Sequence, residues 1–347
     1  MLEEEDFDFI DYENALKEKP DYILDQCYNF ITNLLEDNII RLYTCIDSFL
    51  FQDIDYEKVI GIVPKWVADA GISPESACNK DSYEKMKISF SHPYLNRFVY
   101  YYDLWSLIAA LQDRLQSVEH FMRDYYKTIP CYLKYGEDKY TSYIRTSSQY
   151  TTDAFTSLNS VFVSLASTFD ILTKIAVEQY EFRKYNFALY KKMRSSKILY
   201  NYTTNIINPV LKVDGLLFSA PLCVKKILTF RNEYIHNGPW DLRCSLYETF
   251  INDTPADVIM YSPDMDEYGN FISSGSRNKF YSQGNIINIQ LPQLVIDALS
   301  VIQNTIDKIA DLYSKETVRT EDTELTKECI LVIAKYYALL KEVSDDK

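Results

Sequence analysis

Three side chains near the end of one apolar segment have the types and the spacing needed to cleave a phosphodiester without a metal ion. Arg231 and Asn232 are adjacent, and His236 follows four residues later in the run RNEYIH. RNA cleavage by the 2′-hydroxyl needs one group to take that proton, one to stabilise charge on phosphorus and one to hold geometry. Imidazole, which ordinarily titrates at about 6.5, guanidinium and amide can fill these roles. The run therefore predicts His236 as general acid and base, Arg231 as phosphate clamp and Asn232 as positioning group.

The helix that carries this run is predicted to begin with Pro221 at its first position and to end before the sequence NGPW, because proline is favoured at helix starts and glycine at helix ends. On a helical wheel Arg231 lies in the middle of an apolar face made of Val224, Ile227, Leu228 and Ile235. An unpaired buried charge is costly. We therefore expect Arg231 to need a carboxylate, a phosphate or a polar group from a partner subunit.

The Arg-Asn-x-x-x-His run at a helix end resembles the signature of the HEPN superfamily of endoribonucleases, and the resemblance covers roughly residues 150 to 315. Arg231, Asn232 and His236 match that signature directly. The resemblance implies an up-and-down four-helix bundle that dimerises, so that two copies of the motif line one cleft. It also implies metal-independent RNA cleavage that leaves a 2′,3′-cyclic phosphate, often in a toxin of a toxin-antitoxin pair or an antiviral (phage-defence) effector. The family tends to place a polar residue on the preceding long helix, for which Asp170 is the candidate.

Two other interpretations of the same run stay open. His236 can interact with the helix macrodipole at a C-terminus while Arg231 makes an internal ion pair. Alternatively, a catalytically inactive member of the same fold acts as a helical interaction or adaptor protein. The interpretations differ in whether Arg231 and His236 reach a solvent-accessible cleft or are sealed inside one chain.

Charge is unevenly distributed along this acidic chain, whose formal net charge is −14. Residues 174 to 243 carry twelve basic and five acidic side chains, which favours a local contact with phosphates over unselective coating of nucleic acid. The expected contacts to a single-stranded or tRNA-like RNA are Lys191, Lys192, Lys225, Lys226 and Arg243. The first 21 residues hold nine carboxylates, and we expect this acidic arm to restrain the basic segment until a trigger, an antitoxin or another regulator arrives.

Apolar periodicity predicts a mainly all-α fold with two helical units. An N-terminal helical domain of unassigned role is expected over residues 22 to 148, and a HEPN-like helical domain over residues 149 to 347. The second domain is expected to contain a small β-hairpin insertion, at about residues 244 to 291, after the motif helix. Long helices are expected over residues 22 to 51, 93 to 126, 153 to 176, 292 to 313 and 324 to 343, and another over residues 191 to 207.

The cysteines, the acidic loop residues and the hydropathy of the chain predict which cofactors and which cellular location to expect. Seven cysteines without a Cys-x-x-Cys pair predict neither disulfides nor a zinc site, and Asp264 and Asp266 begin an incomplete calcium loop. We expect no cofactor and no metal. The sequence contains no long uninterrupted apolar run and begins with an acidic segment, so a cytoplasmic protein without membrane association is expected.

Overall fold

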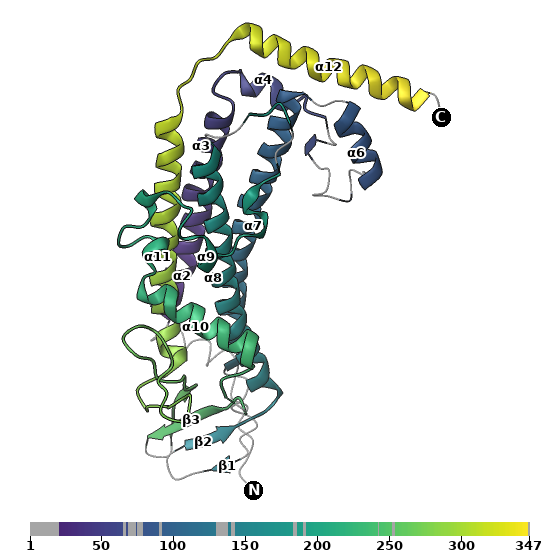
Figure 1. Ribbon diagram of the computed structural model, residues 1–347. Coiled ribbons are helices and arrows are strands. Elements are labelled where there is room, and N and C mark those ends of the chain that lie inside the picture. Colours follow the sequence, from purple (N-terminus) through teal and green to yellow (C-terminus); the bar gives the residue numbers. More distant parts are fainter. Residues whose placement is uncertain are drawn as a thin grey trace. The chain divides into compact units, whose positions relative to one another are not determined.

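The computed structural model describes residues 21–64, 67–68, 74, 79–89, 92–129, 138–139, 143–182, 186–189, 192–241, 243–251 and 254–345. The acidic arm lies outside the described residues, apart from Asp21. The fold is mainly helical (Figure 1). The chain forms two compact units. Unit 1 comprises Met1–Glu36, Asp113–Phe169 and Lys212–Asn304, and unit 2 comprises Asp37–Gln112, Asp170–Leu211 and Thr305–Lys347. The domain boundary expected near residue 148 does not separate the two units, because each unit is built from three separate segments of the chain.

The helices largely follow the predicted periodicity. They are α2 (Asp21–Asn33), a π-helical turn (Leu34–Ile39), α3 (Ile40–Leu50), α4 (Tyr56–Ile60), α6 (Lys80–Ser89), α7 (Pro93–Thr128), α8 (Gln149–Glu181), α9 (Tyr200–Thr203), α10 (Leu222–Asn237), α11 (Ile287–Glu316) and α12 (Thr323–Asp345). Short 3₁₀ turns cover Arg194–Lys197, Pro209–Leu211 and Leu217–Ser219. The helices expected at residues 22 to 51, 93 to 126 and 324 to 343 are confirmed.

The single helix expected over residues 191 to 207 is wrong. A 3₁₀ turn and the four-residue α9 occupy this segment. The backbone amide and the hydroxyl of Ser195 both donate to the buried carboxylate of Glu178, at 3.1 and 2.8 Å. Local polar side chains and this carboxylate compete with helical hydrogen bonding, so the segment folds as short turns.

Helix α8 begins at Gln149, four residues before its predicted start at residue 153. The hydroxyl of Thr151 accepts from the Ser148 amide at 2.8 Å and donates to the Ser148 carbonyl at 2.7 Å. This reciprocal pair closes the first turn ahead of Asp153.

An 18-residue window of α8, with mean hydropathy 1.5, is apolar enough to cross a membrane, but 67% of that window is buried in the structure.

Helix α11 begins at Ile287, five residues before its predicted start at residue 292. Ile286, just before the helix, forms an isolated antiparallel β-bridge with Tyr261. Pro292 lies inside the helix and cannot donate to the carbonyl of Asn288 four residues earlier. The hydroxyl of Tyr126 donates to that carbonyl at 2.6 Å. A side chain from α7 thus replaces the hydrogen bond that proline removes.

The structure contains a four-stranded antiparallel sheet in the order β1-β2-β3-β4. Its strands are β1 (Asp138–Lys139), β2 (Tyr143–Thr146), β3 (Leu246–Ile251) and β4 (Thr254–Ile259). β3 and β4 form the hairpin expected after the motif helix. Strand β2 pairs with β3, placing Arg145 opposite Tyr247, and neither β1 nor β2 was predicted.

Unit 1 has its core where α10 packs with parts of α7, α8 and α11. Its fully or nearly fully buried side chains include Leu115, Val118, Met122, Leu158, Phe162, Val224, Ile227, Phe230, Leu291, Val295 and Leu299. Aromatic rings dominate the part of this core nearest the motif. Phe162 on α8 stacks on Phe230 of α10 with ring centroids 4.6 Å apart and an interplanar angle of 11°.

Unit 2 has its own core, with buried side chains that include Leu42, Ile46, Phe98, Ile108, Leu172, Ile175, Ile306, Ile309 and Tyr313. Several polar groups in this unit are paired. The carboxylate of buried Glu178 also accepts from the Tyr100 hydroxyl at 2.8 Å, and Arg97 pairs with Asp53 at 2.6 Å. These contacts fix the helices of unit 2 to one another.

Candidate active site at the end of helix α10

The candidate motif occupies the last two turns of α10. Pro221 is the N-cap residue, one position earlier than expected, and the helix runs to Asn237. Gly238 follows with φ of 86°, a backbone conformation that glycine adopts at little cost and that ends the helix. The chain then turns into Trp240, which is 3% exposed. The helix end is thus fixed by a glycine turn and an aromatic anchor.

The buried face of α10 differs from the predicted one. Val224, Ile227 and Phe230 are buried, whereas Ile235 is 49% exposed. Phe230 and Trp240 determine this rotation, because their ring centroids lie 5.0 Å apart and both rings pack near Phe162. Arg231 therefore borders the buried face and is half-buried. The expectation that Arg231 lies in the middle of a buried apolar face is wrong.

Arg231 and Asn232 are joined directly. The guanidinium Nη1 of Arg231 donates to the side-chain carbonyl Oδ1 of Asn232 at 2.9 Å, and both residues are half-buried. Among the described residues Arg231 makes no ion pair with a carboxylate. The amide orients the guanidinium without neutralising its charge.

His236 is exposed in the final turn, one turn after Asn232. Between them, Glu233 accepts from the side-chain amide of Asn237 at 2.8 Å and forms an ion pair with Lys279. Burial raises the pKa of the Glu233 carboxyl, but the hydrogen bonds from Lys279 and Asn237 outweigh burial and hold that pKa below its usual value. Neither Arg231 nor His236 is sealed in the protein interior.

Asp170, the weaker candidate, belongs to unit 2, whereas the other three motif residues belong to unit 1. Its carboxylate Oδ1 accepts from the backbone amide of Tyr200 at 2.7 Å, at the start of α9. This contact supports a structural role for Asp170 in holding the segment after α8.

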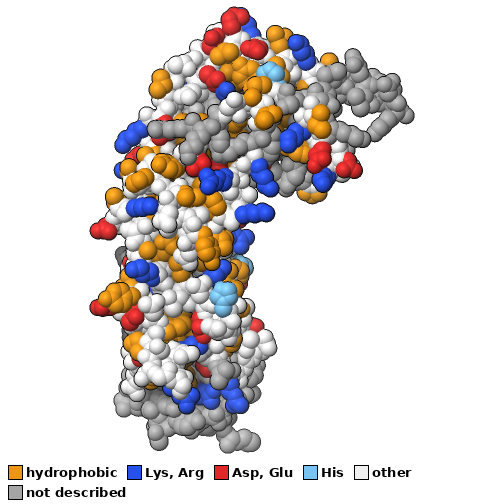
Figure 2. All heavy atoms as spheres, viewed as in Figure 1, with side chains coloured by type: hydrophobic (Ala, Val, Ile, Leu, Met, Phe, Trp, Pro, Cys, Tyr) orange, Lys and Arg blue, Asp and Glu red, His pale blue; other side chains and the backbone are white. Residues whose placement is uncertain are grey.

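The basic residues expected to bind RNA are divided between the two units. Lys225 and Arg243 are exposed and Lys226 is half-buried in unit 1, Lys192 is exposed in unit 2, and Lys191 lies outside the described residues. On the face drawn in Figure 2, blue basic side chains gather near the strands and are scattered among other side chains elsewhere. The basic segment therefore contributes surface to both units and is not confined to the motif.

A cavity of about 680 Å³ lies next to the motif helix in unit 1. It is lined by Trp240, Tyr247, Tyr261, Arg277, Lys279 and Tyr281, among others. None of these residues was predicted as part of a site. Their signal in the sequence was weak, because they are spread between Trp240 and Tyr281 in a polar segment that contains a hairpin, and only folding brings them together.

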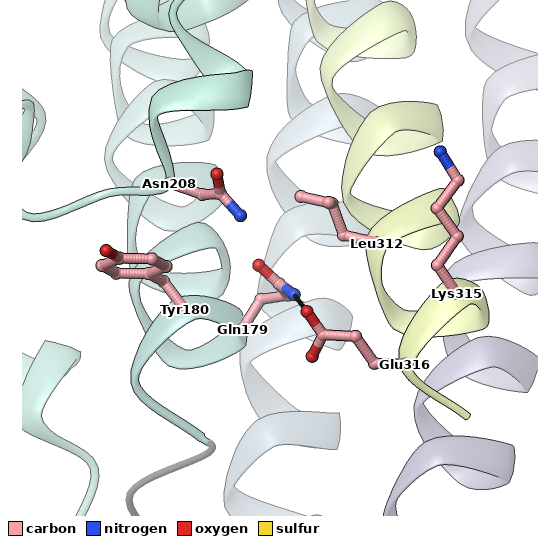
Figure 3. Close-up of a pocket in the computed structure, with 6 residues that line it drawn as sticks. All are labelled: Gln179, Tyr180, Asn208, Leu312, Lys315 and Glu316. Atoms are coloured by element: carbon pink, nitrogen blue, oxygen red, sulfur yellow. Dashed lines mark hydrogen bonds between the residues drawn. The ribbon is translucent and has the colours of Figure 1, made fainter. Parts of the chain in front are cut away.

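A second cavity, of about 290 Å³, lies in unit 2 and is lined by Gln179, Tyr180, Asn208, Leu312, Lys315 and Glu316. In Figure 3 the Glu316 carboxylate points toward Gln179, whose amide donates to it at 3.5 Å. No sequence-predicted site residue lines this cavity. It contains no nucleophile paired with a base, so it offers no chemistry comparable to the motif.

Within the described part of the chain, no three His, Cys, Asp or Glu side chains gather as metal ligands. The carboxylate of Asp264 accepts from the amide and hydroxyl of Ser282, at 2.9 and 2.7 Å. Asp266 accepts from the amides of Tyr268 and Asn270, at 2.9 and 2.8 Å. These two aspartates therefore stabilise loop turns. The five described cysteines are free.

Arg231, Asn232 and His236 thus all lie in the last two turns of one helix, where Arg231 and Asn232 are hydrogen-bonded and His236 is exposed. Comparisons of the chain with protein-family models, with curated proteins and with solved structures found no match.

Proposed function

We propose that this protein is a metal-independent endoribonuclease of the HEPN type, with α10 as the catalytic helix. In this proposal the HEPN-like helical domain spans residues 149 to 347, and the β3-β4 hairpin is its insertion. Its biological role is that of a toxin or phage-defence effector. The observation that carries the proposal is the Arg231–Asn232 hydrogen bond beside an exposed His236.

The state of Arg231 supports phosphate binding. A partly buried guanidinium usually has a carboxylate partner, but this one is held by a neutral amide at 2.9 Å. Its remaining N–H donors and its full charge are available to the non-bridging oxygens of a phosphodiester. Preorganised donors of this kind stabilise charge that develops in the transition state.

The chemistry needs one proton acceptor and one proton donor. In the proposed step, His236 takes the proton of the 2′-hydroxyl, the 2′-oxygen forms a bond to phosphorus, and the bond from phosphorus to the 5′-oxygen breaks. A protonated imidazole then donates a proton to the departing 5′-oxygen. The products are a 2′,3′-cyclic phosphate and a 5′-hydroxyl.

We further propose that two chains associate through the end of α10 and bring two motifs to one RNA. Ile235, next to His236, is 49% exposed, so in this proposal it lies within the surface that the second chain covers. The second motif then supplies the protonated imidazole. Light scattering of the intact protein tests for a dimer, and Ile235→Glu is expected to shift the mass toward the monomer.

The function is tested with His236→Ala in the presence of EDTA. Because His236 is exposed, we expect the fold to be retained and the cleavage of single-stranded or tRNA-like RNA to fall by about 10²-fold or more. His120→Ala is the matched control, since His120 is also exposed and its Nε2 contacts the carboxylate of Asp124 at 3.2 Å. End-group analysis should identify the cyclic phosphate. Undiminished cleavage by His236→Ala would rule out the proposed mechanism, and cleavage by neither protein would favour the adaptor function.

A further inference from the structure

We propose that the 680 Å³ cavity of unit 1 binds one nucleotide of the RNA substrate, with its base among the tyrosines and its phosphate at Arg277. The inference rests on the proposed function, because it gives the candidate nuclease a recognition pocket beside its catalytic helix. The volume lies in the range of small-ligand sites. Nothing in the Arg-Asn-x-x-x-His run itself specifies this pocket.

One wall of the cavity is aromatic. The rings of Tyr247 on β3 and Tyr261 after β4 have centroids 5.2 Å apart, with an interplanar angle of 65°. Tyr281 is 47% exposed, and its hydroxyl donates to the Trp240 carbonyl at 2.8 Å. Aromatic faces held in this way stack on nucleobases with little sequence preference. They suit a base better than a flexible aliphatic ligand.

Trp240 adds an independent sign of a ligand. It lines the cavity and is 3% exposed, and its indole Nε1–H is buried without an acceptor among the described residues. A buried donor without an acceptor is unfavourable, so in this proposal the indole turns toward the cavity and donates to an acceptor atom of the bound base. The carbonyls and ring nitrogens of nucleobases are acceptors of this kind.

The charged residues of the cavity favour an anion. Arg277 is exposed and makes no ion pair within the described residues. The carboxyl of Asp241 also lines the cavity, and burial raises its pKa. A planar guanidinium without a protein partner is suited to bidentate binding of a phosphate.

The cavity is connected to the motif by one ion pair. Lys279 lines the cavity and pairs with Glu233, which stands between Asn232 and His236 on α10. Trp240, another lining residue, follows the end of the same helix and packs on its Phe230. A nucleotide in the cavity therefore belongs to the RNA segment that the motif contacts.

The test measures binding separately from cleavage, using the full-length His236→Ala protein. Fluorescence anisotropy with a labelled single-stranded RNA is compared for Arg277→Ala and Tyr261→Ala added to this background. We expect each to weaken binding by about tenfold, and Arg277→Ala to lower the slope of log affinity against log salt by about one. Tyr261→Phe should bind normally, which separates loss of stacking from misfolding.

Matched controls come from exposed residues outside the cavity. Arg319→Ala and Tyr268→Ala remove side chains of the same types, with Arg319 at 69% side-chain exposure and Tyr268 at 61% exposure, and should change binding less than twofold. Equal affinities for Arg277→Ala, Tyr261→Ala and these controls would overturn the inference.

Competition with AMP and UMP distinguishes a nucleotide of RNA from a free nucleotide. Displacement of the RNA by a mononucleotide supports the inference. Mononucleotide binding that RNA does not displace would overturn the assignment to RNA. If His236→Ala cleaves RNA like the wild type, the proposed function fails while these affinities still report on the cavity. If the cavity variants bind normally and His236→Ala is inactive, only the cavity inference fails.

Discussion

The guanidinium of Arg231 donates to the side-chain carbonyl of Asn232 at 2.9 Å, so two of the three motif side chains are already joined. Neighbouring positions on a helix usually diverge, and this contact directs the arginine back over its own helix. The amide restrains the guanidinium but adds no negative charge. Within the proposed nuclease, Asn232 is therefore a positioning residue for Arg231.

Substitutions at Asn232 should separate positioning from charge. Asn232→Ala removes the acceptor and is expected to lower kcat about tenfold, because Arg231 loses its orientation. Asn232→Asp keeps an acceptor but adds a carboxylate that pairs with Arg231, so we expect a larger loss and weaker RNA binding. Cleavage kinetics and RNA affinity measure the two effects. A fully active Asn232→Asp variant would show that Arg231 does not bind phosphate.

Asp241 should make stability depend on pH. Burial raises the pKa of its carboxyl, partly offset by the Arg243 amide and by the charge of Arg145. At pH values below about 4, the ordinary pKa of an aspartate in an unfolded chain, the Asp241 carboxyl is protonated in both the folded protein and the unfolded chain. As pH rises above this value, the carboxyl loses its proton in the unfolded chain before it does so in the folded protein, and the free energy of unfolding falls. The decrease is complete once pH exceeds the higher pKa of the carboxyl in the folded protein. We expect Asp241→Asn to be more stable than wild type at pH 7, and the difference to vanish toward pH 3.

Asp264 supplies a control of opposite sign for the Asp241 prediction. Burial raises the pKa of its carboxyl, but hydrogen bonds from Ser282 and Asn285 outweigh burial and bring that pKa below its usual value. This contribution to stability is present above the unfolded pKa and is lost as pH falls through the folded pKa. Asp264→Asn should therefore be less stable than wild type at pH 7. Urea unfolding of wild type, Asp241→Asn and Asp264→Asn between pH 3 and pH 7 measures whether each substitution raises or lowers the free energy of unfolding.

Tyr126 and Pro292 should be coupled energetically. Tyr126→Phe removes the donor to the Asn288 carbonyl and is expected to cost about 1–2 kcal/mol. Pro292→Ala restores a backbone N–H that can donate to the same carbonyl. The tyrosine substitution should then cost at least about 0.5 kcal/mol less in the Pro292→Ala background. A double-mutant cycle from urea unfolding measures the coupling, and additive effects would contradict it.

Gly269 should tolerate substitution less well than Gly275. Both have positive φ, 82° and 57°, but a Cβ on Gly269 would lie 3.2 Å from the backbone nitrogen of Lys226, whereas one on Gly275 meets nothing within 4 Å. Gly275→Ala is expected to cost about 1 kcal/mol from backbone strain alone. Gly269→Ala adds a clash with α10 and should cost about 2–3 kcal/mol. Equal costs in thermal unfolding would show that the loop moves away from α10 freely.

Much of the fold could be predicted from the sequence because its signals are local. The apolar period located α7, α8 and α12, and alternation located the β3-β4 hairpin. Helix ends were less predictable, since the start of α11 depends on a hydroxyl from Tyr126 that sits far away in the sequence. The same limit hid β2, which pairs with β3 about a hundred residues later.

The sequence by itself determined the candidate chemistry, because the spacing of Arg231, Asn232 and His236 places all three near one helix end. Only the tertiary structure decided which face of α10 is buried. The packing of Phe230 against Phe162 and Trp240 sets that rotation, and it leaves the motif accessible to solvent. Tertiary structure alone also formed the aromatic cavity. The spacing of apolar residues predicts where helices and strands form. It does not predict which rings or strands pack together, because these partners come from distant parts of the chain.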